Sequence, residues 1–136
     1  MVQRLLQVAV IDPSAIIAID AAETLAERLA CRADAYTPAQ FVAMAQDRHF
    51  DLIVLAMEDD RGIQFPDEPV TDRHFRQAIA DMARACRAPV ILLSTDCGND
   101  RGIPGFEGCP VVLKPYFPDD LVAAAVAALS RRTPAR

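Results

Sequence analysis

Short, continuous apolar runs are the feature that most constrains the fold of this chain. The clearest run is Leu52-Ile-Val-Leu-Ala-Met57, which directly follows Asp51, and similar runs lie at 5–11 and 90–94. A strand that is buried on both faces reads as a continuous apolar run, whereas a half-exposed strand alternates apolar and polar residues. The runs therefore predict central strands of a parallel sheet that carries helices on both of its faces.

Segments with helical spacing of apolar residues separate these runs. The first expected helix begins after Ser14, a good N-cap, and ends at about Ala30. Its apolar residues are Ile16, Ile17, Ile19, Leu25 and Leu29. Further helices are expected at 37–47, 72–87 and 121–129, and further short strands at 34–36 and 110–113. Two connections, 58–71 and 95–109, show no helical pattern, so the second of them lacks the helix that an α/β alternation would place there.

Strands that alternate with helices predict an α/β fold with a doubly wound, five-stranded parallel sheet. We expect one domain at 1–130, a flexible basic tail at 131–136 and no output domain. In such sheets ligands bind beyond the carboxyl ends of the strands. The residues at those ends are Asp12, Ala56, Ser94 and Lys114. Lys114 is the single lysine among 14 basic residues, the other 13 of which are arginines.

Charge and composition exclude several classes of function. A net charge of −5 argues against a nucleic-acid partner, which requires clustered cations. No apolar run is long enough to cross a membrane, and the first residues lack a signal-peptide pattern, so a cytoplasmic location is expected. The four cysteines, Cys31, Cys86, Cys97 and Cys109, form no Cys-x-x-Cys pair. We expect the cysteines to serve as small apolar side chains. The alternative is that Cys97 and Cys109 form a redox switch.

The strand ends resemble those of the receiver domain of bacterial two-component response regulators. Strand 1 ends Val10-Ile11-Asp12-Pro13, the central strand is 51–57, strand 4 ends Leu93-Ser94, and Lys114-Pro115 follows strand 5. The resemblance covers nearly the whole chain and implies the receiver strand order 2-1-3-4-5. Two functional residues of the family are replaced: Ala56 stands at the phosphoacceptor position and Pro13 at the second acid.

The connection after strand 4 is similar to that of alphaproteobacterial single-domain receivers, in which the fourth helix is absent or shortened. Their Phe-Ala-Thr-Gly-Tyr motif is not present, because the corresponding residues are Leu92-Leu-Ser-Thr-Asp96. The fourth helix of the family is therefore expected to be absent or shortened in this chain as well.

The two replacements imply a degenerate site. Alanine offers no oxygen nucleophile for phosphoryl transfer, and Asp12 alone remains of the family's acids, so Mg²⁺ binding should be weak or absent and no cofactor or enzymatic activity is expected. Lys114 is expected to pair with Asp12, the alternatives being the Glu58–Asp60 loop or a phosphoryl oxygen. Displaced acceptor chemistry at Asp59 or Asp60, or phosphate held by Ser94 and Lys114, remains an alternative.

The sequence therefore predicts a phosphorylation-independent protein-interaction module of two-component signalling. Its partner would be a histidine kinase or another two-component protein, and it could form a homodimer through strand 5 and the last helix. The candidate interaction face comprises Phe106, Val111, Tyr116, Phe117, Val122 and Val126. A nucleotide-binding enzyme is disfavoured, because the turn after strand 1 lacks a glycine-rich phosphate loop.

Overall fold

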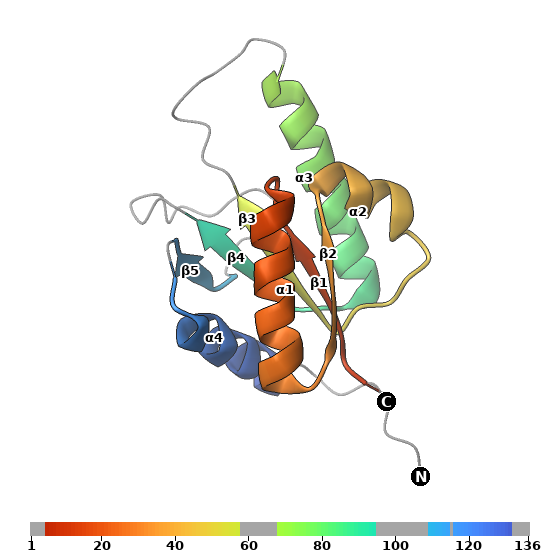
Figure 1. Cartoon of the computed structure of the whole chain (residues 1–136). Helices are drawn as coiled ribbons and strands as arrows, with labels where there is room; N and C mark the ends of the chain where they lie inside the picture. Colours follow the sequence, from red (N-terminus) through yellow and green to blue (C-terminus); the bar gives the residue numbers. More distant parts are fainter. Residues whose placement is uncertain (1–4, 58–67, 95–108, 115, 132–136) are drawn as a thin grey trace.

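The computed structural model describes residues 5–57, 68–94, 109–114 and 116–131 (Figure 1). Within them, five strands form one sheet in the order β2-β1-β3-β4-β5, and all four strand pairs are parallel. The predicted fold class and strand order are confirmed. The elements are β1 Gln7–Ile11, α1 Ala15–Leu29, β2 Arg32–Tyr36, α2 Pro38–Met44, β3 Leu52–Met57, α3 Glu68–Cys86, β4 Val90–Ser94, β5 Val111–Leu113 and α4 Pro118–Arg131.

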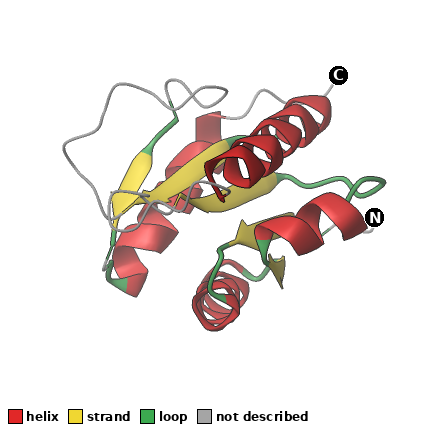
Figure 2. Ribbon diagram, turned by 90° about the horizontal axis from the view of Figure 1, so that it is seen from above, coloured by secondary structure: helices red, strands yellow, loops and turns green. Residues whose placement is uncertain are grey.

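Helices cover the sheet on both faces, as the continuous apolar runs predicted. On one face, Val8 and Val10 of β1 pack in a buried cluster with residues of α1 and α4. On the other face, Ala9 and Ile11 pack in a second cluster with residues of α2 and α3. The alternation along β1 follows from the period of two of a strand, which sends successive side chains to opposite faces. Figure 2 shows the sheet from above, with helices on both of its faces.

Two helices begin earlier than the sequence predicted, and both begin at a proline or one residue before it. α3 starts at Glu68 rather than Asp72, with Pro69 in its first turn, and α4 starts at Pro118 rather than Leu121. Proline is compatible with a first helical turn, because the N–H groups there have no partner within the helix. α2 is shorter than predicted and ends at Met44. The connection 95–108 lies outside the described residues, so the loss of a helix there stays a prediction.

Only some of the apolar residues expected on α1 are buried. Its buried residues are Ala18, Ala21, Ala22 and Leu25, whereas Ile16, Ile17 and Ile19 are exposed. The buried set has the i, i+3, i+4, i+7 spacing of one helix face, which fits the expected helical period. Leu25 belongs to the expected apolar residues, and Leu29 packs against the same core. Small side chains let α1 lie close to the sheet, and the three isoleucines are left on the solvent side.

None of the helices in the described ranges has the length and apolar character needed to span a membrane.

Candidate functional site

The carboxyl ends of β1, β3, β4 and β5 meet at one edge of the sheet. The strand register pairs Ile11 with Leu55 and Ser94 with both Met57 and Leu113. Asp12 and Lys114 directly follow β1 and β5, Ser94 ends β4, and Ala56 is the last residue but one of β3. The four residues therefore lie at the ends of four neighbouring strands, as the sequence predicted. The order β2-β1-β3-β4-β5 places β3, which carries Ala56, at the middle of this edge.

An ion pair between Asp12 and Lys114 joins the ends of β1 and β5. Lys114 Nζ donates to Asp12 Oδ2 at 2.9 Å, the Asp12 side chain is fully buried, and that of Lys114 is 11% exposed. The second carboxylate oxygen, Oδ1, accepts a hydrogen bond of 2.8 Å from the Ser14 backbone N–H. Both oxygens of Asp12 are thus satisfied, as a buried charge requires. The predicted pairing of Lys114 with Asp12 is confirmed.

Ala56, which the sequence resemblance places at the phosphoacceptor position, is buried. Ala56 belongs to the apolar cluster between the sheet and the pair α1 and α4, where it packs with residues such as Ala18 and Leu121. Pro13, which the resemblance aligns with the second acid, is exposed and has no oxygen in its side chain. Among the described residues, no group of three His, Cys, Asp or Glu side chains is placed to hold a metal ion.

Tyr116 lies two residues after Lys114 and packs against the core cluster that α1 and α4 share. Its ring is half-buried against the cluster of α1 and α4, and this burial raises the pKa of its phenol. The negative charges of Asp20 and then Asp12 raise the pKa further.

The predicted interaction face is only partly exposed. Val111 is 50% exposed, Phe117 75% and Val126 47%. Tyr116 and Val122 instead pack against the core, which the sequence did not indicate. Leu113 is exposed at 46% and was missed, although it lies two residues from Val111 and therefore on the same face of β5. Phe106 lies outside the described residues.

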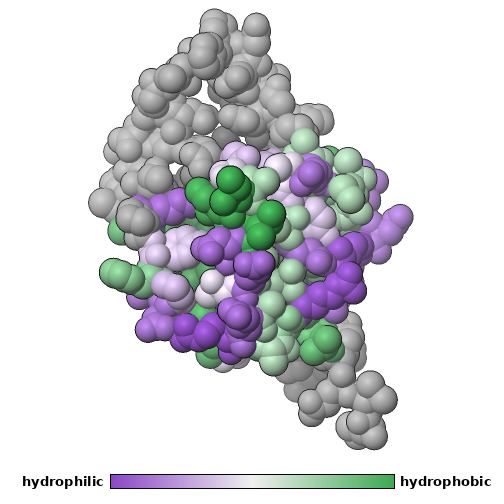
Figure 3. Space-filling model, in the orientation of Figure 1, coloured by the Kyte–Doolittle hydropathy of each residue, from purple (hydrophilic) through white to green (hydrophobic). Residues whose placement is uncertain are grey.

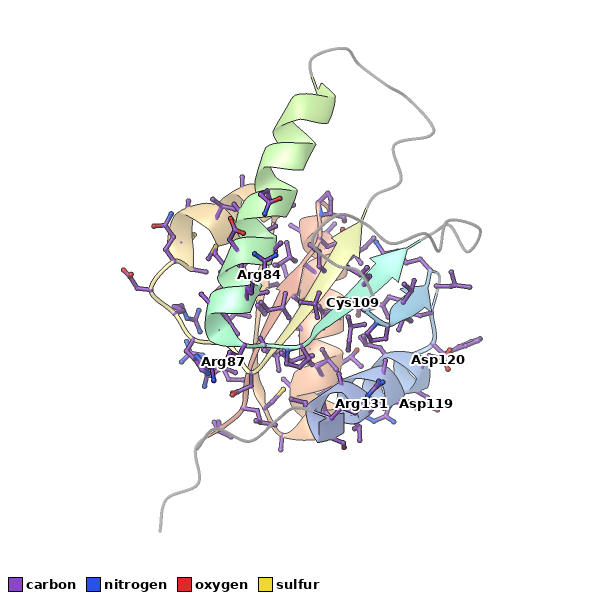
Figure 4. All side chains as sticks on the ribbon, turned by 180° about the vertical axis from the view of Figure 1, so that it is seen from behind. Arg84, Arg87, Cys109, Asp119, Asp120 and Arg131 are labelled. Carbon is purple, nitrogen blue, oxygen red and sulfur yellow. The ribbon has the colours of Figure 1, made fainter. Side chains whose placement is uncertain are left out.

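Several other predicted residues also fall outside the described part of the chain. They are Glu58, Asp59, Asp60, Cys97 and the side chain of Ser94. Of the described cysteines, Cys31 is buried in the core beside Leu25. Cys109 packs on the side of the sheet that α3 covers (Figure 4). Both fit the expected role of small apolar side chains.

A parallel sheet in this strand order has the flavodoxin-like, doubly wound α/β architecture. No family model and no curated protein sequence matches the chain. Solved structures do match. The response regulator receiver protein from Sinorhizobium medicae WSM419 is 19% identical over 95% of this chain and 98% of that one, with a TM-score of 0.65.

Two further solved structures give the same result. The signal receiver domain of an HD domain-containing protein from Pseudomonas fluorescens Pf-5 is 19% identical, covers 95% of this chain and 98% of that one, and has a TM-score of 0.68. The chemotaxis response regulator CheY4 of Vibrio cholerae is 18% identical, covers 92% and 99%, and has a TM-score of 0.65. The chain therefore has the fold of response regulator receiver domains.

Proposed function

We propose that this chain is a degenerate receiver that acts in two-component signal transduction as a phosphorylation-independent protein-interaction module. The observation that carries the proposal is the pairing of the buried Asp12 carboxylate with Lys114 beside a buried methyl group at Ala56. Among the described residues at this edge, Asp12 is thus already paired with a cation, and the side chain of Ala56 offers no nucleophile.

The chemistry of the described residues supports this reading. Transfer of a phosphoryl group needs an attacking oxygen and cations that neutralise the phosphate charge. Ala56 supplies no oxygen, and Pro13 supplies no ligand. Asp12 would have to give up Lys114 to bind Mg²⁺, an ion that is usually held through one or two carboxylates in a strict octahedron. Metal binding should therefore be weak or absent, and the chain needs no cofactor.

Such a module would act through protein contacts in the cytoplasm. Its partner would be a histidine kinase or another two-component protein. Val111, Leu113, Phe117 and Val126 give the β5 and α4 side an apolar surface that could also join two copies of the chain.

Titration of the full ¹⁵N-labelled chain with Mg²⁺ and then acetyl phosphate, followed by intact mass, tests the proposal. We expect amide signals of Asp12, Ala56 and Lys114 to stay in place and the mass to stay unchanged. A stable phosphoryl adduct would overturn the proposal, and its site would decide between Asp59 and Asp60 as displaced acceptors. The double variant Pro13→Asp with Ala56→Asp is the matched positive control, because it returns both carboxylates to the strand ends.

A further inference from the structure

The edge of the sheet at β2 carries backbone groups that the fold does not pair. β2 is the first strand in the sheet order, and within the described residues it pairs only with β1. Figure 1 shows β2 at the edge of the sheet, between α1 and α2. Such an edge strand is a template on which another chain can add a strand.

Two hydrogen bonds establish which residues of β2 turn their backbone toward this edge. Arg32 N–H donates to the Leu6 carbonyl at 2.9 Å, and the Tyr36 carbonyl accepts a bond of 3.0 Å from the residue after β1. Successive residues of a strand point their N–H and C=O groups to alternate sides, so Ala33 and Ala35 point theirs away from β1. Within the described part of the chain, no hydrogen bond reaches these four groups.

β2 lacks the features that usually protect an edge strand, which are proline, lysine, a bulge, short length or a covering element. Its sequence contains neither proline nor lysine, and all five of its residues pair with β1 in one unbroken register. Ala33, Asp34 and Ala35 are half-buried rather than buried, and an alanine side chain shields little of the backbone beside it. The edge is therefore accessible to a further strand.

The side chains on one face of β2 leave a positive charge beside this edge. Asp34 Oδ2 accepts a hydrogen bond of 2.8 Å from Arg48 Nη2 and lies 3.5 Å from Arg32 Nε. Arg48 also donates to the Tyr36 hydroxyl, and its Cζ lies 4.9 Å from the centre of the Phe50 ring. Arg48 is thus held in place. One carboxylate serves two guanidinium groups, and Arg32, whose side chain is 61% exposed, can turn to an added acidic group.

Recognition at β2 would rest on backbone groups and charge rather than on a large apolar patch. Figure 3 shows that the strongly apolar side chains on this side of the molecule gather over the upper part of α1, with hydrophilic side chains beneath and beside them. An extended segment suits such a site, because its main chain supplies the affinity and its alternate side chains supply the specificity.

A second copy of this chain fits the edge poorly. α1 packs more on β2 than on β1, and a two-fold pairing through β2 would bring the copy's own α1 to the same face. Paired strands lie about 4.8 Å apart, whereas packed helices need about 8–10 Å between their axes, so the two helices would be too close. In the register that joins all four free groups to those of the copy, the two Asp34 carboxylates would also face each other, which is destabilising.

We infer that the β2 edge binds an extended segment of a partner protein, which adds a strand to the sheet through Ala33 and Ala35 and carries an acidic residue beside Arg32. The inference rests on the proposed function, since it names a contact by which a phosphorylation-independent module would hold its partner. The single extended segment brings no helix to the edge, and its carboxylate supplies the charge that Arg32 lacks.

Short peptides in which valine alternates with glutamate probe the edge directly. One is unmodified, a second is N-methylated at every valine and a third at every glutamate. Only one of these two sets of N–H groups can face β2, because the sets point to opposite edges of the peptide. With the full chain, without Mg²⁺ or phosphodonor, we expect one methylated peptide to bind at least tenfold more weakly than the other.

Amide hydrogen exchange locates the contact. We expect the unmodified peptide to slow exchange of the Ala33 and Ala35 amides at least tenfold, because these N–H groups gain an acceptor in the added strand. The Asp34 amide is the internal reference, since it already faces β1 and its exchange should change less. The methylated set that fails reports the direction of the added strand, which is antiparallel for valine and parallel for glutamate.

Two pairs of variants make the test specific. Ala33→Pro removes one outward N–H and should weaken binding at least tenfold, whereas Ala39→Pro, in the first turn of α2 where proline is tolerated, should bind like the wild type. Arg32→Glu should reverse the preference for the glutamate peptide over one with lysine in place of each glutamate. Arg84→Glu is its control, because Arg84 is 66% exposed but lies on α3. Circular dichroism checks that each variant is folded.

The remaining outcomes separate this inference from the proposed function. Equal binding of both methylated peptides, or unchanged exchange at Ala33 and Ala35, would overturn the added strand and leave the proposed function to the mass measurement. Exchange at these two amides that slows with protein concentration, without peptide, would overturn the partner segment in favour of a second copy. A phosphoryl adduct on a chain that still binds the peptide would keep the β2 edge and overturn phosphorylation independence.

Discussion

Lys114 lies 2.9 Å from Asp12 although 102 positions separate them in the chain, and their contact ties the strand at one edge of the sheet to a strand near its centre. β5 is only three residues long, so few ladder hydrogen bonds hold it to β4. The ion pair therefore supports the position of β5, and of the segment that leads to α4, as well as satisfying a buried charge.

Replacement of Lys114 alone should lower the free energy of unfolding more than replacement of Lys114 and Asp12 together. Lys114→Met leaves the Asp12 carboxylate buried without its counter-charge, and we expect a loss of about 3 kcal/mol in the free energy of unfolding. Asp12→Asn with Lys114→Met should recover at least half of this loss, because a neutral amide can still accept the Ser14 N–H. Urea unfolding of the two variants measures both values. Equal losses would show that the pair contributes little beyond packing.

The two tyrosines should make the chain sensitive to alkaline pH. Burial is the largest cause that raises the pKa of both Tyr36 and Tyr116, and the charges of Asp20 and Asp12 raise that of Tyr116 further. A folded-state pKa above the unfolded value means that the unfolded chain loses its protons first. Stability is therefore intact below pH of about 10 and falls as the pH rises through the folded-state pKa values.

Near-ultraviolet absorbance of the phenolate checks this directly. The pH midpoint of tyrosine ionisation in the folded chain should lie above the midpoint in urea. Tyr116→Phe should reduce the amount by which the free energy of unfolding falls at alkaline pH. A folded midpoint equal to that in urea would contradict the effect of burial. Tyr36, whose hydroxyl is bound by Arg48, supplies the phenolate signal that remains in the Tyr116→Phe variant.

The fold and the placement of the site could be read from the sequence because both depend on local pattern. Runs such as 52–57 identify strands buried on both faces, and parallel strands bring their carboxyl ends to one edge, which placed Asp12 beside the end of β3. Which side of α1 faces the sheet could not be predicted in this way. Isoleucine is more apolar than alanine, but the close approach of α1 to the sheet requires the small side chains of Ala18, Ala21 and Ala22.

The backbone at the end of α1 offers a stabilising substitution. Ala30, its C-cap, has φ 50° and ψ 47°, which is the left-handed region that favours glycine. Ala30→Gly should raise the free energy of unfolding by about 0.5–1 kcal/mol, because relief of strain exceeds the added entropy of the unfolded chain. Ala26→Gly, inside the same helix, is the control and should lower stability by about 1 kcal/mol. Thermal unfolding of both variants measures the difference, and a loss for both would show that Ala30 is unstrained.

Phe117 tests whether the β5 and α4 side joins two copies of the chain. Its side chain is 75% exposed just before α4, beside a helix whose buried residues are Leu121, Ala125 and Ala128. We expect the wild-type chain to associate with rising concentration in sedimentation experiments and Phe117→Glu to stay monomeric, because a charge in an apolar contact is costly to desolvate. Ile16→Glu is the matched control, since Ile16 is equally exposed but lies on α1, and it should associate like the wild type. A wild-type chain that is monomeric at every concentration would leave this surface to a different protein partner and rule out the homodimer.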